Sequence, residues 1–185
     1  MNTERIEELI KELIIEIGDD PNRHGLIETP FRVAKMYQEI FSGYHNMPEN
    51  TIKQFIDTKH GDGIVIRDIP FYSVCEHHIM PFWGMINIAY IPSGETILGL
   101  SKFSRIVDYY SKKLQLQECL GQQICDSIME EIQACGVMVL IKAEHLCMSM
   151  RGVKKPGVNT VTTVSRGLFK DNYQLRMEYL SLLNM

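Results

Sequence analysis

The sequence predicts an α+β fold, in which an N-terminal helical arm precedes a β-sheet and its helices. Apolar residues recur at helical spacing in the N-terminal segment, and the pattern becomes β-like from about Ile64. From there the expected order is strand, strand, helix, helix, strand, strand. With 185 residues, 45% of them apolar and 23% charged, the chain has the composition of one ordinary domain with a full core.

The arm is predicted to span residues 1–60 and to contain two helices. The first ends at Gly18, which suits a left-handed C-terminal cap. The second has Thr29 as its N-cap and Pro30 at its first helical position, and it ends near Gly43. Apolar residues at helical spacing mark the first helix: Ile6, Leu9, Ile10, Leu13, Ile14 and Ile17.

Residues 61–185 are predicted to form a single structural unit without an internal repeat or a linker. After the segment from Ile64, strands are expected over residues 83–91, 137–150 and 160–169. The expected helices are 101–114 with Ser101 as N-cap, a helix from 116 that ends at Gly136, and a closing helix over 171–183.

The net charge is −4 and is unevenly distributed, because residues 1–100 carry 8 basic and 15 acidic side chains whereas residues 101–185 carry 11 and 8. Without a long basic stripe, nucleic acid is not an expected partner, and a small anionic ligand in the second part fits better. No apolar run approaches the ~20 residues that span a bilayer, so no membrane contact is expected. Five cysteines without a secretory signal indicate a reducing compartment, the cytoplasm.

Cys75 and His78 offer a thiolate and an imidazole three positions apart, and Cys147 offers a second thiolate much later in the chain. Borderline-soft Zn2+ prefers these ligand types, and one tight turn can direct the first two side chains toward the same ion. Three protein ligands leave a tetrahedral zinc one open position, where the pKa of a bound water falls from ~15.7 to about 7. The pattern therefore predicts a catalytic zinc site.

A closed structural site is the alternative, because Cys119, Cys125 or Cys135 could supply a fourth thiolate. Cys125 lies beside Ile124 and Ile128 on the apolar face of a predicted helix, which is more typical of a core residue. The chain lacks the paired C-x-x-C pattern of a zinc ribbon, and it also lacks the H-x-E and P-C-x-x-C signature of the zinc deaminases.

His77 and His145 adjoin the proposed ligands without being needed in the set. Alternation along the predicted strand 137–150 puts four side chains on one face: His145, Cys147, Ser149 and Arg151. An imidazole with an ordinary pKa of ~6.5 suits general acid or base catalysis, so both histidines are candidate catalytic residues. A histidine that only fills space or orients a ligand is the alternative for each.

Charged and amide side chains in the second part suit a small anionic ligand. Gln117 offers an amide, and Glu118 offers a carboxylate that can accept two N–H donors side by side, such as N1–H and N2–H of guanine. Taken singly, an acidic residue near a helix start or a surface cation is more typical of a solvated surface. Four cations are candidates to bind phosphates: Lys102, Arg105, Arg151 and Lys154.

These residues lie in motifs that resemble the GTP cyclohydrolase I family. The resemblance covers the chain from about residue 25 to 170, with several separated motifs in the family's order. The matching segments are Thr29-Pro30, Arg32-Val33-Ala34-Lys35, Cys75-Glu76-His77-His78, Ile88-Ala89-Tyr90-Ile91-Pro92, Gly99-Leu100-Ser101-Lys102, Arg105-Ile106-Val107, Leu116-Gln117-Glu118, His145-Leu146-Cys147-Met148 and Arg151-Gly152-Val153.

The resemblance implies the family's T-fold, or tunnelling fold, an antiparallel sheet with two helices on one face whose strands join those of other subunits into a barrel. It also implies a homo-oligomer, a decamer of two pentamers, with active sites between subunits. Edge strands that would be a liability in a monomer would be paired by this assembly. Isolated subunits are accordingly expected to be inactive.

The resemblance further implies a zinc-dependent enzyme that acts on GTP, with Cys75, His78 and Cys147 as the ligands of Zn2+. Water attacks C8 of the imidazole ring while His145 protonates N7, and a second hydrolysis releases formate. The sugar then opens and rearranges, and ring closure gives 7,8-dihydroneopterin 3'-triphosphate, the first step of folate or pterin biosynthesis.

The other site residues are carried over by position in the matching motifs. His77 and Ser101 resemble residues that assist at the sugar, and Gln117 and Glu118 match guanine-binding positions. The triphosphate positions are matched by Lys102, Arg105 and Arg151, together with Arg32 and Lys35 from a neighbouring subunit.

Three positions depart from the family pattern, and none of them is a proposed zinc ligand. Cys119 stands where Arg is usual, Phe31 where a polar residue is common, and Val158 where Ser or Thr is frequent. Two rival functions remain. A nitrile reductase with the same fold would use a nucleophilic Cys and NADPH instead of zinc, and a non-catalytic zinc-stabilised assembly module would need a closed site.

Overall fold

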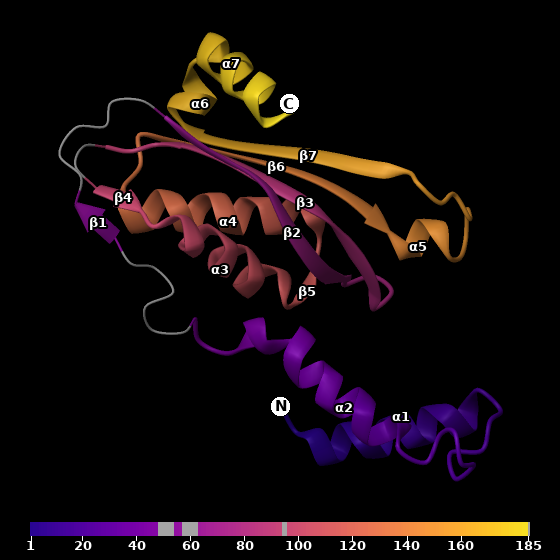
Figure 1. The fold of residues 1–185 in the computed structure, drawn as a ribbon. Helices are drawn as coiled ribbons and strands as arrows, with labels where there is room; N and C mark the ends of the chain where they lie inside the picture. The colour runs from indigo at the N-terminus through magenta and orange to yellow at the C-terminus, as the bar shows by residue number, and fades with distance from the viewer. Residues whose placement is uncertain (48–53, 57–62, 94–95, 185) are drawn as a thin grey trace.

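Five strands form the central sheet of the computed structural model, which describes residues 1–47, 54–56, 63–93 and 96–184 (Figure 1). Their order across the sheet is β5-β2-β3-β6-β7. The long strands pair antiparallel, as the family resemblance implied, whereas the two-residue β5 runs parallel to β2. The strands are β2 Ile64–Cys75, β3 Met80–Ile91, β5 Leu114–Gln115, β6 Gly136–His145 and β7 Asn159–Gly167.

Two helices, α3 Leu100–Ser111 and α4 Gln117–Ile132, cover one face of the sheet (Figure 1). Each presents an apolar stripe at helical spacing toward the strands. Fully buried side chains make up these stripes: Phe103, Ile106 and Val107 of α3, and Leu120, Ile124, Cys125 and Ile128 of α4. Burial of each large side chain stabilises the fold by about 1.5–3 kcal/mol. The structure therefore contains both predicted helices, on the same face.

The opposite face carries a smaller core beneath α6 Leu168–Asp171 and α7 Tyr173–Leu183. Side chains alternate along β6, so Val139 and Ile141 contribute to the larger core whereas Met138 and Leu140 contribute to the smaller one. The predicted strand 160–169 ends early, at Gly167, because α6 begins at the next residue.

Several predicted helix ends in the sheet domain are wrong. α3 ends at Ser111, so Leu114 belongs to β5, and the closing helix α7 begins at Tyr173 rather than at residue 171. The N-cap of α3 is Gly99, and Ser101 lies inside the first turn. α4 ends at Ile132 with Gln133 in the left-handed conformation as its C-cap, so Gly136 belongs to β6. A side chain at Gly136 would meet the backbone of α6 at 3.2 Å, which explains a glycine at this strand start.

The arm consists of α1 Thr3–Glu16 and α2 Thr29–Ile40, which pack against each other and extend from the sheet (Figure 1). Gly18 has a φ of 93°, the left-handed conformation predicted for the end of the first helix. The boundary predicted between residues 60 and 61 lies outside the described residues. The short strands β1 Gln54–Ile56 and β4 Thr96–Leu98 pair with each other.

Both ends of α2 differ from the prediction. Glu28 is the N-cap and makes no side-chain cap, so Thr29 is the first helical residue and Pro30 follows it in the first turn. The helix ends at Ile40, and a short 3-10 helix, η1 Ser42–Tyr44, includes Gly43. Gly43 approaches the backbone of Tyr109 and Lys112 closely, which ties the arm to the end of α3.

The predicted strand 137–150 is wrong beyond His145. Pairing of β6 ends at Phe82 of β3 and Asn159 of β7, so later residues have no strand partner. The chain forms one helical turn instead, α5 Leu146–Ser149, in which the Ser149 hydroxyl donates to the carbonyl oxygen of His145 at 3.2 Å. The alternating face predicted for residues 145–151 therefore does not exist.

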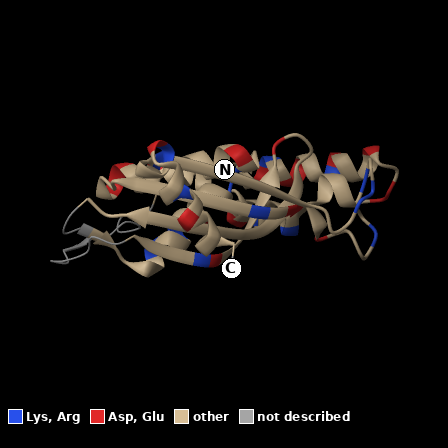
Figure 2. Cartoon of the chain, turned by 90° about the horizontal axis from the view of Figure 1, so that it is seen from above, with Lys and Arg blue, Asp and Glu red and all other residues tan. Residues whose placement is uncertain are grey.

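Acidic and basic residues are interspersed along the strands and helices (Figure 2). In the described part of the chain, every helix is too short or too polar to cross a membrane.

Candidate active site

Cys75, His78 and Cys147 meet at one end of the sheet. Cys75 is the last residue of β2, His78 follows in the turn to β3, and Cys147 lies in α5 directly after β6. The turn is tight, since the N–H of His78 donates to the carbonyl oxygen of Cys75 at 3.4 Å. Because β3 lies between β2 and β6, these two ends are close. The potential ligand atoms all lie within 4.8 Å of one another.

This donor set fits a zinc ion. A tetrahedral zinc with Zn–S near 2.3 Å and Zn–N near 2.0–2.1 Å separates its ligand atoms by about 3.5–3.8 Å, so only small adjustments are needed. Cys75 is buried, Cys147 is half-buried and His78 is exposed. Burial raises the pKa of the Cys147 thiol, and the adjacent Cys75 raises it further. A divalent cation between the two sulfurs would favour both thiolates.

Arg151 reaches the cluster from the segment after α5. Its Nη1 lies 3.2 Å from Nε2 of His78, within hydrogen-bonding distance. Arg151, predicted to bind phosphate, therefore lies beside the proposed zinc ligands.

A cavity of about 200 Å³ adjoins the cluster. Its wall is formed by the end of β2, the first turn of α4 and the junction of β6 with α5, together with Thr160 of β7. Its lining residues are Cys75, His77, Gln115, Leu116, Gln117, Glu118, His145, Cys147, Met148 and Thr160. The structure thus brings six of the predicted site residues together around one cavity.

Several lining residues were not predicted as site residues. Thr160 reaches the cavity because β7 pairs with β6, where Thr160 lies opposite Ala143. Gln115 is in β5 and is buried. Neither carries a chemical signature in the sequence, so only the pairing of strands reveals them.

His145 is held from two sides. Its ring stacks on Phe82 with centroids 4.5 Å apart and planes 3° from parallel. Its Nε2 lies 2.9 Å from Oε1 of Gln117. Burial lowers the pKa of His145, and the carboxylate of Glu118 opposes this effect. The ring is therefore fixed in orientation and lies within reach of a cavity ligand.

Ser101, Lys102 and Arg105 do not line the cavity. They lie in the first half of α3, whereas the far end of this helix leads into β5 beside Cys75. At 1.5 Å per residue, Ser101 lies about 15 Å along the helix axis from Ser111. Lys102 is buried and Arg105 is exposed, although their spacing puts them on neighbouring turns.

Arg32 and Lys35 belong to α2 in the arm and do not line the cavity either. Arg32 forms an ion pair with Glu28, the N-cap residue of this helix. Lys35 lines a shallow groove between α1 and α2. One copy of the chain therefore does not gather the predicted phosphate-binding residues.

The other cysteines lie apart from the cluster. Cys125 is completely buried, with its Sγ 3.5 Å from the carbonyl oxygen of Val137, so its prediction as a core residue is confirmed. Cys119 is half-buried on α4, and Cys135 is exposed. Among the residues that the structure describes, no fourth thiolate accompanies the three proposed ligands.

The fold and the site define an α+β protein in which three residues that could hold a metal ion lie beside a cavity lined by His145 and Glu118, an arrangement typical of hydrolytic metalloenzymes. The family model for GTP cyclohydrolase I matches residues 6–184, and the chain belongs to this family. The resemblance seen in the motifs is thereby confirmed, and the chain is an enzyme of the GTP cyclohydrolase I type, for which GTP is the implied substrate.

Curated relatives carry the same name over their whole length. GTP cyclohydrolase 1 of Caldanaerobacter subterraneus subsp. tengcongensis is 51% identical over 184 residues, covering 100% of this chain and 98% of the relative. The protein of Clostridioides difficile is 50% identical over 186 residues, with the same coverage. That of Bacillus cytotoxicus is 48% identical, covering 99% and 97%.

Among solved structures, the chain is similar to the apo form of the archaeosine synthase QueF-Like. The TM-score is 0.49 and the sequence identity 20%, and the similarity covers 59% of this chain and 97% of that one. At these values the likeness supports no conclusion about fold or function.

Proposed function

We propose that the chain catalyses the zinc-dependent hydrolysis of GTP at C8, which releases formate and forms 7,8-dihydroneopterin 3'-triphosphate in the first step of folate or pterin biosynthesis. The cluster of Cys75, His78 and Cys147, which borders a cavity lined by His145 and Glu118, carries the proposal. A set of ligands for one metal ion, beside an acid–base group and a carboxylate, suits the hydrolytic opening of a purine ring.

Cys75, His78 and Cys147 hold the zinc ion in this proposal. Two thiolates balance the two charges of the ion, and a neutral imidazole completes a set that leaves one position open. When bound, zinc supplies a Lewis acid that lowers the pKa of water from ~15.7 to about 7.

His145 supplies the proton that N7 of guanine gains as the ring opens. Glu118 selects guanine, because one carboxylate can accept N1–H and N2–H side by side, and its exposed side chain borders the cavity. His77 lines the same cavity and assists at the sugar, together with Ser101. Each of these groups acts by holding or moving a proton at a defined atom of the substrate.

The cavity is completed by a neighbouring subunit in a T-fold barrel, within a cytoplasmic homodecamer of two pentamers. Ser101 lies about 15 Å along α3 from the end of the helix nearest the cavity, so a second copy has to supply Ser101, Lys102 and Arg105 to the substrate. Arg32 and Lys35 are supplied in the same way. An edge strand such as β7 offers the free backbone groups through which sheets of different subunits can join.

The two rival functions fit these observations less well. A nitrile reductase needs one nucleophilic Cys, whereas Cys75 and Cys147 lie together with His78 at metal-ligand spacing. A structural zinc module needs a closed set, and the described residues offer three ligands beside a cavity.

Formate release from GTP tests the proposal. Purified protein is expected to lose formate release and pterin formation when a chelator strips its metal, and to regain both with Zn2+. Cys147→Ser should lose bound zinc and activity together, whereas Cys135→Ser, at an exposed position, should keep both. Undiminished formate release by protein that contains no metal would contradict the proposed role of zinc.

A further inference from the structure

The amide of Gln117 is saturated by the protein itself. Gln117 is 2% exposed, at the start of α4. Its Nε2 donates to the carbonyl oxygens of Ile141 and Thr160 at 3.2 and 3.1 Å, and to Oγ1 of Thr162 at 3.1 Å. Backbone carbonyls only accept, so the nitrogen of this amide has to face β6 and β7. Both of its protons are used there.

The orientation of the amide determines that one particular ring nitrogen of His145 carries a proton. Oε1 of Gln117 faces Nε2 of His145 at 2.9 Å, and because an amide oxygen only accepts, Nε2 has to carry a proton. This hydrogen bond can form with the neutral ring and with the protonated ring alike. Nδ1 makes no hydrogen bond to the residues that the structure describes, so it is the nitrogen left to exchange a proton.

The plane of the ring is fixed independently. Phe82, which is completely buried, stacks on His145 and lies opposite it in the pairing of β3 with β6. The stack sets the plane of the imidazole, and Gln117 sets which of its nitrogens bears the permanent proton. Proteins usually fix the tautomer of a catalytic acid or base through a hydrogen bond to a third group.

We propose that Gln117 is a positioning residue that holds His145 in its Nε2–H form, so that the proton delivered to the substrate leaves from Nδ1. This inference rests on the proposed role of His145 as the proton donor. The Nδ1–H bond breaks, the proton passes to N7 of guanine, and the electron pair stays on Nδ1, which leaves a neutral Nε2–H imidazole. The side-chain amide of Gln117 then has no proton left to donate to guanine. Its role as a positioning residue replaces the guanine contact that the family resemblance implied.

The tautomer can be measured without turnover. Solid-state NMR of protein labelled with 15N-histidine reports which ring nitrogen carries the proton, whatever the size of the assembly. At a pH where the ring is neutral, His145, identified by the signal lost in His145→Ala, is expected as the Nε2–H tautomer. Gln117→Met, which removes the accepting oxygen, should populate both tautomers. A parent protein with His145 as Nδ1–H overturns the proposal, whether or not it is active.

Binding and turnover separate positioning from substrate contact. Gln117→Met should lower kcat by about tenfold or more. In the His145→Ala background, which blocks turnover, adding Gln117→Met should change the Kd of GTP by less than about twofold in calorimetry. Gln122→Met, at an exposed position of the same helix, is the control and should behave like the parent.

A rise in the Kd of GTP of about tenfold or more in the double variant would indicate that Gln117 contacts guanine, and would overturn the proposal. If the parent released no formate at all, the proposed function would fail, but the NMR measurement would still decide what Gln117 does to His145.

Discussion

The two histidines of the candidate site differ in their surroundings. His145 is half-buried, stacked on Phe82 and hydrogen-bonded to Gln117, whereas His77 is exposed in the turn after β2. Catalysis by proton transfer gains from a ring that is already in position and partly shielded from water. His145 therefore has the surroundings expected of the proposed general acid.

His145→Ala is expected to lower formate release by roughly 10²–10⁴-fold, the usual contribution of general acid catalysis. Zinc content and the mass of the oligomer should not change, because Cys75, His78 and Cys147 are untouched. Formate release and elemental analysis of the metal measure the two effects separately.

His24→Ala serves as the matched control, since His24 is exposed in the loop between α1 and α2. It should retain the activity of the parent. Full turnover by His145→Ala would rule out this residue as the proton donor.

The buried and exposed cysteines should react very differently with an alkylating reagent. Burial raises the pKa of the Cys125 thiol from 9.0 to about 12, whereas Cys135 is exposed. Thiolates are the reactive species, so at pH 8.5 iodoacetamide should modify Cys135 readily and Cys125 only after denaturation, as peptide mass spectrometry would show.

The raised pKa of Cys125 also makes the stability of the fold depend on pH. The folded state disfavours the thiolate. The contribution of the neutral thiol to the free energy of unfolding is therefore complete below pH 9, and it is lost as the pH rises from 9.0 toward about 12. Cys125→Ala removes this group, and its unfolding midpoint should fall less steeply over that range than that of the parent. Equal slopes for the two proteins would contradict the assignment.

At the scale of elements, the contact between β3 and β6 depends on one glycine. Gly84 lies opposite Ala143, and a Cβ at Gly84 would overlap the carbonyl oxygen of Lys142. The same pair of strands carries Phe82 opposite His145, so the position of the imidazole ring depends on this pairing. Backbone cannot move aside as the end of a flexible side chain can.

Gly84→Ala is accordingly expected to destabilise the fold by roughly 3 kcal/mol, through the strain of overpacking. Thermal denaturation followed by circular dichroism measures the effect. Gly121→Ala is the matched control, because its Cβ would meet the side chain of Val164 at 3.1 Å, and alanine in a helix gains about 1 kcal/mol over glycine. Equal stability of the two variants would contradict the close approach at Gly84.

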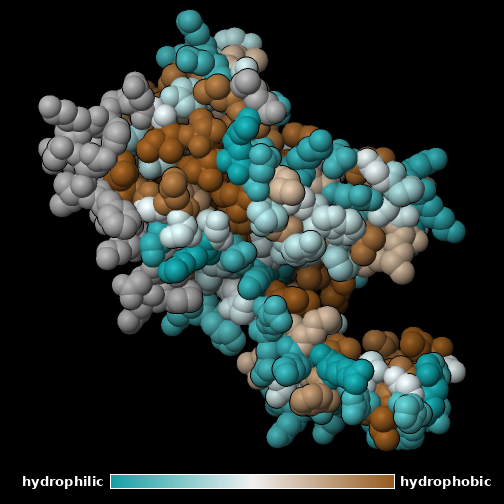
Figure 3. All heavy atoms as spheres, in the orientation of Figure 1, coloured by the Kyte–Doolittle hydropathy of each residue, from teal (hydrophilic) through white to brown (hydrophobic). Residues whose placement is uncertain are grey.

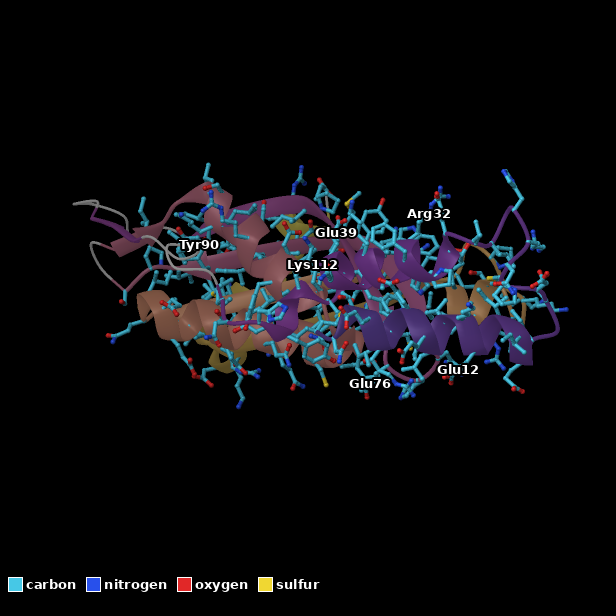
Figure 4. The ribbon with its side chains drawn as sticks, turned by 90° about the horizontal axis from the view of Figure 1, so that it is seen from below. Glu12, Arg32, Glu39, Glu76, Tyr90 and Lys112 are labelled. Carbon is cyan, nitrogen blue, oxygen red and sulfur yellow. The ribbon has the colours of Figure 1, made fainter. Side chains whose placement is uncertain are left out.

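At the scale of the whole molecule, apolar surface remains uncovered in one copy of the chain. Leu9, Leu13 and Ile17 of the arm are 45%, 53% and 72% exposed. Figure 3 shows apolar surface on the arm and at its junction with the sheet. A groove of about 500 Å³ at this junction is lined mainly by apolar side chains, with Glu39 and Lys112, both labelled in Figure 4, among its lining residues. Such surface is typical of a subunit in an assembly.

Mixed oligomers should reveal whether the active sites lie between subunits. Cys147→Ser subunits lack a zinc ligand, and Arg105→Ala subunits lack a proposed phosphate contact, so each variant alone should be nearly inactive. When equal amounts are unfolded together and refolded, random assembly should restore roughly a quarter of the parent's sites, since each site then draws on two different chains.

Formate release by the mixture, compared with each variant refolded alone, is the measurement. A mixture of Cys147→Ser with His145→Ala is the control, because both residues line the cavity of the same chain and no intact site can form. Activity no higher in the first mixture than in this control would place the phosphate contact within one subunit.

Local patterns predicted most of the elements and brought together the residues that could hold a metal. The helices of the arm, α3, α4 and the long strands follow from apolar periodicity, which depends on neighbours along the chain. Cys75 and His78 are candidate ligands by chemical type and by a spacing that one turn satisfies, and the structure places them in a group that could hold a metal ion. Cys125 was correctly assigned to the core, because it continues the apolar stripe of its helix.

What the sequence by itself determined, then, was the α+β class, the order of its elements and the kinds of chemical group available to a metal and an acid. Only the tertiary structure decided that the strand ends at His145, because its pairing partners end there. Only it joined Gln117 to His145, and separated Ser101 from the cavity by the length of α3. Periodicity and ligand type are properties of short segments, whereas strand length, tautomer and distance depend on which segments pack together.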